Sequence, residues 1–371
     1  MRILLTTDTV GGVWTFTREL ASGLLQRGHA VVLVSLGRMP SESQRAWVLE
    51  VEERYGKDFR YEAFEVPLEW MEENGSSYSG AERSLLRVVE GFGAEVVHAS
   101  QFCFGALPVT LPKVVTAHSD VLSWAMACRP GGLEDSEWLQ QYKELVRVGV
   151  EGADLVVAPT EWMREALQSA FPAGYEARVI LNGRSLDAGA GSKARMLQAV
   201  TAGRLWDEAK GLSLLSGVEA CMPVLVVGET RFEGGGAPEL QGMQLPGVMD
   251  EDEVLGLFRS SSLYLATSIY EPFGLAPLEA ALCGCGVLAR DIASLREVWG
   301  DAADYFTDGD TLQRLMLRLR DSPAELEALR RRSMGRALEL SADRMVDGYC
   351  RLYQELLASR SGCEEVAAYA G

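Results

Sequence analysis

Glu271 and Glu279 lie eight positions apart, on the two sides of a glycine turn and an expected helix start. Pro277 suits the first position of that helix, because its fixed φ is helical and its missing N–H would be unpaired there. The preceding Ala276 has no side-chain oxygen to cap the free N–H groups of the first turn. Such a helix start attracts anions, of which phosphate is a common one. Because carboxylates would repel a phosphate unless they bind hydroxyls instead, the segment predicts a site for a sugar attached to a phosphate.

Two cations, Arg204 and Lys210, follow the expected strand Gln198–Ala202. Ligands of doubly wound sheets bind at the carboxyl ends of the strands, so both cations are predicted to lie near the ligand. Two positive charges in a partly dry site would stabilise a diphosphate leaving group by roughly several kcal/mol. No metal ion is then needed, and the chain has no Asp-x-Asp arrangement in a suitable loop. Taken alone, the pair would be interpreted as solvated surface charges.

The turn after the first strand also offers backbone donors. Asp8–Gly12 joins the strand Arg2–Thr6 to an expected helix, Thr15–Arg27, and its two glycines let the backbone approach a ligand. The Gly-x-Gly-x-x-Gly spacing of NAD sites is absent, which argues against a dinucleotide oxidoreductase. A tight turn that binds no ligand is the alternative interpretation.

Of the three histidines, His118 has the position best suited to a ligand. It closes the apolar strand Val114–Ala117 at a carboxyl edge, where a polar side chain can face a ligand. His29 lies at the entry to a strand and is predicted to be structural. His98 ends a strand, and its position fits either role.

Short β-branched apolar runs alternate with amphipathic helical stretches, which indicates βαβ units and parallel sheets. A first series of strands is expected at Arg2–Thr6, Ala30–Ser35, Val96–His98, Val114–Ala117, Leu155–Ala158 and Arg178–Leu181. A second series is expected at Gln198–Ala202, Val224–Val227, Leu263–Ala266, Val287–Ala289 and Asp304–Phe306. We therefore expect two domains, residues 1–183 and 193–342, joined by a hinge at Gly183–Ser192.

The composition is that of a two-domain globular protein. A chain of 371 residues with 47% hydrophobic residues is long enough to bury two separate cores. Its 35 basic and 53 acidic residues give a formal charge of −18, which argues against nucleic acid and anionic membranes as partners. The sequence shows no long apolar run and no signal peptide, so we expect a cytoplasmic protein without stable membrane association. Seven cysteines without a Cys-x-x-Cys pair fit reduced, mostly buried thiols.

Five segments, in this order, resemble the signature of GT-B glycosyltransferases of family 4, a large family that includes sucrose-phosphate synthases and bacterial mannosyl- and glucosyltransferases. They are Asp8–Val13, Thr116–Ser119, Ile180–Gly183, Gly203–Gly211 and Tyr270–Ala281. The family usually has Arg and Lys five residues apart, whereas Arg204 and Lys210 are six apart. The resemblance implies an α/β fold of two Rossmann-like doubly wound domains that face each other across a cleft. It also implies that a last helix, at about 343–371, packs back onto the first domain.

The resemblance further implies a role for each candidate residue. The predicted catalytic residues, which hold the diphosphate or the transferred sugar, are Glu271, His118, Lys210 and Arg204. Glu271 would bind hydroxyls of the sugar and His118 would donate to one of them, while Glu279 would bind the ribose. The predicted donor-binding residues are Gly12, Arg204, Lys210, Val248, Met249, Phe273, Gly274, Leu275 and Glu279. Asp8, Trp70 and Trp124 in the first domain are the candidates for acceptor contacts, with buried packing as the alternative role of the two tryptophans.

These roles predict a retaining glycosyltransferase that moves a hexose from a nucleoside diphosphate sugar to a soluble small-molecule or saccharide acceptor, with neither metal nor cofactor. UDP-glucose is the favoured donor and GDP-mannose the alternative; the acceptor and the oligomeric state are not predicted. A GT-B sugar-nucleotide 2-epimerase or a catalytically silent binding protein would share the phosphate site. A glycosidase is disfavoured, because the spacing of Glu271 and Glu279 does not dictate the roughly 5–9.5 Å carboxyl separation that hydrolysis needs.

Overall fold

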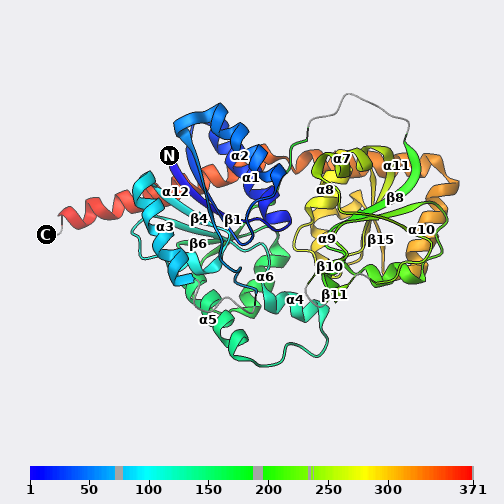
Figure 1. The fold of residues 1–371 in the computed structure, drawn as a ribbon, viewed down its shortest axis with the longest axis horizontal. Helices are drawn as coiled ribbons and strands as arrows, with labels where there is room; N and C mark the ends of the chain where they lie inside the picture. The colour runs from blue at the N-terminus through cyan, green and yellow to red at the C-terminus, as the bar shows by residue number, and fades with distance from the viewer. Residues whose placement is uncertain (72–77, 187–194, 233–234, 237, 370–371) are drawn as a thin grey trace. The chain divides into compact units, whose positions relative to one another are not determined.

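The computed structural model describes residues 1–71, 78–186, 195–232, 235–236 and 238–369. The described chain forms two compact units. Figure 1 colours the chain by residue number. Unit 1 comprises Met1–Ser123, Leu133–Gly183 and Ala342–Gly371, and unit 2 comprises Trp124–Gly132 and Arg184–Ser341. Of the expected hinge Gly183–Ser192, residues 187–192 lie outside the described residues.

Unit 1 is built on a parallel sheet whose seven described strands follow the order β3-β2-β1-β4-β5-β6-β7. The strands are β1 (Arg2–Asp8), β2 (Ala30–Leu36), β3 (Phe59–Phe64), β4 (Val96–Ala99), β5 (Lys113–Thr116), β6 (Leu155–Ala158) and β7 (Ala177–Val179). The helices are α1 (Gly12–Gln26), α2 (Glu42–Tyr55), η1 (Gly56–Asp58), α3 (Tyr78–Phe92), η2 (Phe102–Ala106), α5 (Glu137–Gly152), α6 (Glu161–Ala170) and α12 (Ala342–Tyr369). A further helix, α4 (Val121–Cys128), begins in unit 1 and continues from Trp124 as part of unit 2. Every residue of β2 is buried, as expected of a parallel strand covered on both faces.

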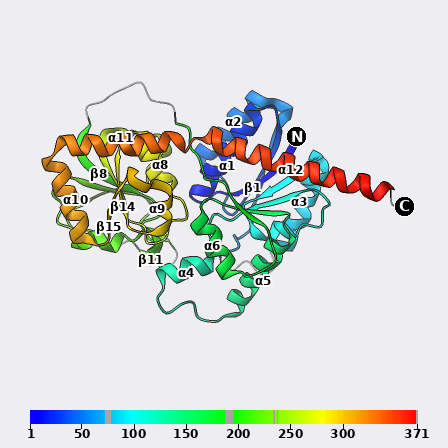
Figure 2. The same cartoon turned by 180° about the vertical axis from the view of Figure 1, so that it is seen from behind.

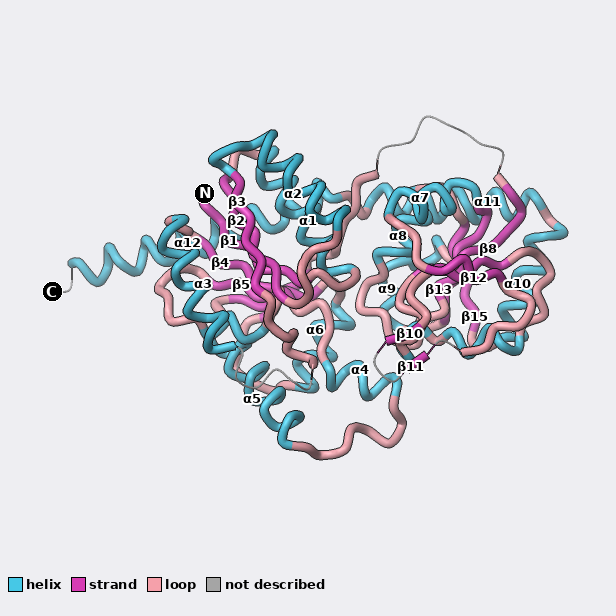
Figure 3. Tube along the Cα trace, viewed as in Figure 1, coloured by secondary structure: helices cyan, strands magenta, loops and turns pink. Residues whose placement is uncertain are grey.

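Unit 2 has its own parallel sheet of six described strands, in the order β12-β9-β8-β13-β14-β15. Figure 3 draws the strands in magenta. They are β8 (Met196–Ala202), β9 (Val224–Val227), β12 (Gln244–Gly247), β13 (Ser261–Ala266), β14 (Gly286–Arg290) and β15 (Asp304–Phe306), with a small hairpin of β10 (Arg231–Phe232) and β11 (Gly235–Gly236). The helices are η3 (Glu208–Lys210), η4 (Leu212–Gly217), α7 (Glu251–Ser260), α8 (Leu275–Leu282), α9 (Ala293–Trp299), η5 (Gly300–Ala302), α10 (Gly309–Asp321) and α11 (Pro323–Glu339).

The strand order of unit 2 reverses at β8, which lies between β9 and β13. In an open α/β sheet such a reversal leaves a crevice at the carboxyl ends of the two neighbouring strands, and ligands bind there. Each unit also has a separate apolar core, one around Leu4, Val34 and Val156 and the other around Val226 and Leu265. The expected α/β class with two doubly wound domains is confirmed.

The last helix, α12, closes unit 1. Figure 2 shows it running beside α1, and Arg27 of α1 forms ion pairs with Asp343 and Asp347 at 3.1 and 2.7 Å. Tyr353 and Tyr349 of α12 reach the sheet, where their hydroxyls bond His98 Nδ1 at 2.6 Å and Thr116 Oγ1 at 3.0 Å. Within the described residues, no helix combines the length and the apolar content needed to cross a membrane.

Candidate functional site

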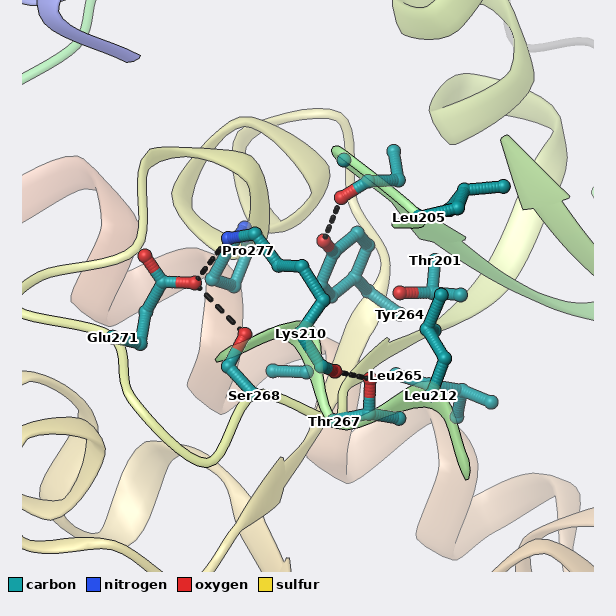
Figure 4. A pocket seen from close by; sticks show the side chains of 13 residues that line it. Thr201, Leu205, Lys210, Leu212, Tyr264, Leu265, Thr267, Ser268, Glu271 and Pro277 are labelled. Atoms are coloured by element: carbon teal, nitrogen blue, oxygen red, sulfur yellow. Dashed lines mark hydrogen bonds and ion pairs between the residues drawn. The ribbon is translucent and has the colours of Figure 1, made fainter. Parts of the chain in front are cut away.

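A small pocket opens at the carboxyl ends of β8 and β13, the reversal point of the unit 2 sheet (Figure 4). Lys210 and Glu271 line it, together with Ser268 and Pro277. Lys210 Nζ lies 2.8 Å from Glu271 Oε2, and Ser268 Oγ donates to the same carboxylate oxygen at 2.9 Å. Both charged side chains are only partly exposed, at 23% and 17%. The two residues predicted to bind phosphate and sugar are therefore brought together as an ion pair.

The backbone around Lys210 fixes its position against the end of β13. The carbonyl oxygen of Lys210 accepts a hydrogen bond from Thr267 Oγ1 at 2.7 Å. The next residue, Gly211, has a φ of 60°, and a Cβ there would lie 2.5 Å from the carbonyl oxygen of Thr267. Only glycine fits this left-handed turn against another backbone. The loop therefore holds Lys210 at the pocket through contacts that do not involve its charge.

Asp207 organises the loop between Arg204 and Lys210. Its Oδ1 accepts the N–H of Ala209 at 3.0 Å and so caps the short turn η3, while its Oδ2 binds Arg204 at 2.7 Å. Burial would raise the pKa of Asp207, but the Arg204 charge and hydrogen bonds outweigh it and lower the pKa below its usual value. Arg204 also stacks over Trp206, with its guanidinium carbon 5.5 Å from the ring centre. Asp207 and Trp206 thus orient the Arg204 side chain.

The helix start predicted from Pro277 is two residues too late. α8 begins at Leu275 with Gly274 as its N-cap at a φ of 90°, and no side chain caps it. Pro277 is then the third helical residue. Proline fits there because N–H groups in the first turn have no partner within the helix, so none is lost. Glu279, in the next turn, is 16% exposed and accepts a hydrogen bond from Arg184 Nε at 2.9 Å. Phe273 is buried, and Val248 and Met249 lie in the loop before α7, Val248 being 75% exposed.

Unit 1 carries Asp8, Gly12 and His118. Asp8 ends β1 and its Oδ1 accepts the N–H of Val10 at 2.8 Å, while Gly12 is the first residue of α1, three residues before the helix start expected at Thr15. His118 follows β5, packs edge-on against Phe16 at 4.6 Å between ring centres, and has Nε2 3.3 Å from Ser100 Oγ. Desolvation lowers the pKa of His118 to about 3, so its imidazole is neutral and can donate through one nitrogen.

His98 is structural. It is buried, and both ring nitrogens are occupied, Nδ1 by Tyr353 and Nε2 by Thr116, each at 2.6 Å. Desolvation also lowers its pKa to about 3. His29 lies 3.4 Å from the N-terminal amine of Met1, in agreement with the structural role predicted for it.

The two acceptor tryptophans lie in different units. Trp70 is in unit 1 and 37% exposed, next to the buried Glu69, whose carboxylate accepts backbone N–H groups at the start of η2. Trp124 was expected in the first domain, but its contacts assign it to unit 2. There its Nε1 lies 3.4 Å from Asp207 Oδ1, and Arg129 lies over its ring at 5.0 Å. Trp124 is therefore a neighbour of the Arg204–Lys210 loop.

Sequence reasoning missed Arg184, Asp207 and Ser268. Asp207 stands three positions after Arg204 and so could have been recognised as its partner. Arg184 directly follows the Leu181–Gly183 segment, but nothing in its spacing points to Glu279, 95 positions away. In the part of the chain that the structure describes, no group of three or more His, Cys, Asp and Glu side chains is arranged to hold a metal ion.

Two family models match the chain. The model of Glycosyltransferase Family 4 matches residues 10–188, and that of Glycosyl transferases group 1 matches residues 240–330. The chain belongs to the glycosyltransferases of the family 4 type. The matched ranges include the Gly12 turn, His118 and the Glu271–Glu279 segment. The family expected from the sequence is thereby confirmed.

Relatives of this family 4 glycosyltransferase include the serotype-specific mannosyltransferase WbdA of Escherichia coli, 30% identical over 125 residues, which are 32% of this chain and 15% of WbdA. Alpha-maltose-1-phosphate synthase of Mycolicibacterium smegmatis is 26% identical over 247 residues, 56% of this chain and 62% of that protein. The chain thus spans only about one seventh of the length of WbdA.

Solved structures show the same fold. Sucrose-phosphate synthase from Thermosynechococcus elongatus has a TM-score of 0.77 at 18% identity, over 97% of this chain and all of that one. Anabaena Alr3699/HepE, solved in complex with UDP and glucose, has a TM-score of 0.70 at 15% identity, over 95% and 99% of the two chains. At these identities the likeness supports the GT-B fold.

Proposed function

We propose that this family 4 glycosyltransferase transfers a hexose from a nucleoside diphosphate sugar to a hydroxyl of a soluble acceptor, with retention of anomeric configuration and without a metal ion. The observation that carries the proposal is the grouping of Lys210, Glu271 and Ser268 at the reversal point of the unit 2 sheet, beside the uncapped start of α8. A cation, a carboxylate and backbone donors at one edge match a ligand that has both phosphates and hydroxyls.

The ion pair suggests how the donor enters. A diphosphate brought to Lys210 competes with Glu271 for the ammonium group, and the carboxylate released from Lys210 can accept hydrogen bonds from sugar hydroxyls. Backbone N–H groups of Phe273, Gly274 and Leu275 complete the phosphate contacts, because the start of α8 has no side-chain cap. Arg204, held by Asp207, supplies a second positive charge near the leaving group. Both cations stabilise the negative charge that grows on the diphosphate as the glycosidic bond breaks.

The preferred donor is UDP-glucose, which is supported by the HepE structure containing UDP and glucose. A mannose donor, GDP-mannose, is the second candidate, because WbdA is a mannosyltransferase. A cytoplasmic location remains a prediction from the sequence.

The decisive experiment incubates the purified protein with a panel of radiolabelled nucleotide sugars and follows release of nucleoside diphosphate, with and without candidate saccharide acceptors. Release of UDP or GDP together with a labelled product supports the proposal, and the anomeric configuration of the product, determined by NMR, tests retention. A new sugar nucleotide without release would establish an epimerase instead. No turnover with any donor, in protein that still binds nucleotide, would indicate a silent binding protein.

A further inference from the structure

Arg184 is a buried cation between two carboxylates. Its side chain is 3% exposed, its Nε donates to Glu279 Oε1 at 2.9 Å, and its Nη2 donates to Glu251 Oε1. Its own backbone N–H is held by the carbonyl oxygen of Leu340 at 3.1 Å. The guanidinium therefore links α7, of which Glu251 is the first residue, to the second turn of α8.

Stability alone does not account for this arrangement. Replacing a buried ion pair by apolar side chains of similar volume is often neutral or stabilising, so such a pair is weak evidence for a contribution to the free energy of folding. What a guanidinium does supply is geometry, because its planar fork holds two acceptors in fixed directions and stays charged at every physiological pH. Arg184 thus fixes the direction of the Glu279 carboxylate relative to the start of α7.

Glu279 on α8 and the loop before α7 are both predicted to contact the nucleoside of the donor. Glu279 is the predicted ribose contact, and Val248 and Met249, predicted to border the base, lie in the loop that leads into α7 through its cap residue Asp250. Glu279 also lies close in sequence to the pocket residue Glu271, because α8 starts directly after the turn that contains Glu271.

We propose that Arg184 is a positioning residue for nucleotide recognition. It holds the Glu279 carboxylate ready for the ribose hydroxyls and ties the base-side loop to it through Glu251. This inference rests on the function proposed above. Its consequence is that Arg184 acts on nucleotide affinity through Glu279 and has little direct effect on the transfer step.

The test is a double-mutant cycle with UDP and GDP as probes. Affinities of the wild type, Arg184→Met, Glu279→Gln and the double variant are measured by calorimetry, with kcat from nucleoside diphosphate release. We expect Arg184→Met to weaken binding by about tenfold in the wild type and by less than about twofold in the Glu279→Gln background, since groups in contact are not additive. KM for the donor should rise by a similar factor, with kcat changed by less than about threefold.

A matched control is Arg195→Met. Arg195 is another arginine of unit 2, less buried than Arg184, and it contacts the other end of α8, donating to the carbonyl oxygens of Ser261 at 2.9 Å and of Cys283. This variant should lower the melting temperature without changing nucleotide affinity. If Arg184→Met does not fold, Arg184→Lys serves instead, because it keeps the charge but cannot bridge both carboxylates; it should show a smaller loss of affinity that is again absent beside Glu279→Gln.

Equal losses of affinity on Arg184→Met in the wild-type and Glu279→Gln backgrounds would overturn the inference, as would unchanged affinity in Arg184→Met alone. These outcomes leave the proposed function intact, because they require a wild-type protein that binds nucleotide. A wild type that binds neither UDP nor GDP, nor any other nucleoside diphosphate, would overturn the function and this inference together.

Discussion

Lys210→Ala is the sharpest test of the phosphate site, because the structure predicts two separate consequences. The substitution removes the cation that would face the diphosphate, and it also leaves the Glu271 carboxylate, 17% exposed, without the ammonium group 2.8 Å away. Two unit charges about 4 Å apart interact by about 4 kcal/mol at an effective dielectric constant of 20. Loss of one group that stabilises transition-state charge typically costs about 3–4 kcal/mol, so we expect kcat to fall by about 100- to 1000-fold.

The carboxylate left without its lysine should then repel the ligand. We expect the affinity for UDP or GDP to fall by about 100-fold in Lys210→Ala and to recover by about tenfold, or 1.4 kcal/mol, when Glu271→Gln is added. Calorimetry measures the affinities, and release of nucleoside diphosphate measures turnover. Lys57→Ala, which removes the same charge from η1 of unit 1, is the control and should change neither quantity.

Two results would refute the reasoning. Wild-type turnover in Lys210→Ala would show that this lysine does not stabilise the leaving group. Equal nucleotide affinity in Lys210→Ala and in the double variant would show that Glu271 does not compete with the phosphates for the ammonium group, and the proposed exchange of partners would be wrong.

Further predictions concern metal dependence, the Gly211 turn and pH. EDTA should leave kcat unchanged; inactivation that Mg²⁺ or Mn²⁺ reverses would contradict a diphosphate neutralised by side chains alone. Gly211→Ala should lower the free energy of unfolding by about 1–3 kcal/mol and reduce turnover, whereas Gly56→Ala, also at positive φ but with open space around it, should reduce stability alone. Folded His98 and His118 stay neutral down to a pKa of about 3, while the unfolded residues protonate near pH 6.5. The unfolded state therefore binds more protons between these values. Lowering the pH from 6.5 to 5 should reduce the free energy of unfolding by about 2 kcal/mol per histidine, as measured by denaturant titration, and the total reduction should be smaller in His118→Asn.

The fold was predictable because most strands of a parallel sheet are buried on both faces. Each expected strand is present, with its ends shifted by a few residues. In the two parallel sheets, the strands that the sequence analysis missed are β3 (Phe59–Phe64) and β12 (Gln244–Gly247), and both lie at the edge of a sheet. An edge strand is partly exposed and tolerates charge or proline, as in Arg60, Glu62 and Pro246, so its sequence has no continuous apolar run.

The grouping of Lys210 and Glu271 at one sheet edge could be predicted from the sequence, but the partners of the charged side chains could not. Spacing and the positions after strands indicated Lys210, Glu271 and Glu279, since the ends of neighbouring parallel strands meet at one edge. Which carboxylate each cation binds depends on the tertiary path of the chain. Lys210 pairs with Glu271, 61 positions away, and Arg184 with Glu279, 95 positions away, and no local pattern carries that information.

The return of the chain into unit 1 through α12 bears on how the protein is made. Synthesis starts at the N-terminus, and domains generally fold as units as they emerge. Here the sheet of unit 1 is complete by β7 at Val179, yet His98 and Thr116 lack their tyrosine partners until Tyr349 and Tyr353 have been translated. The main stretch of unit 2, Arg184–Ser341, is finished earlier. Unit 1 therefore cannot complete its packing until α12 has been synthesised, and a nascent chain stopped before α12 would leave His98 and Thr116 without these partners, open to chaperones and proteases.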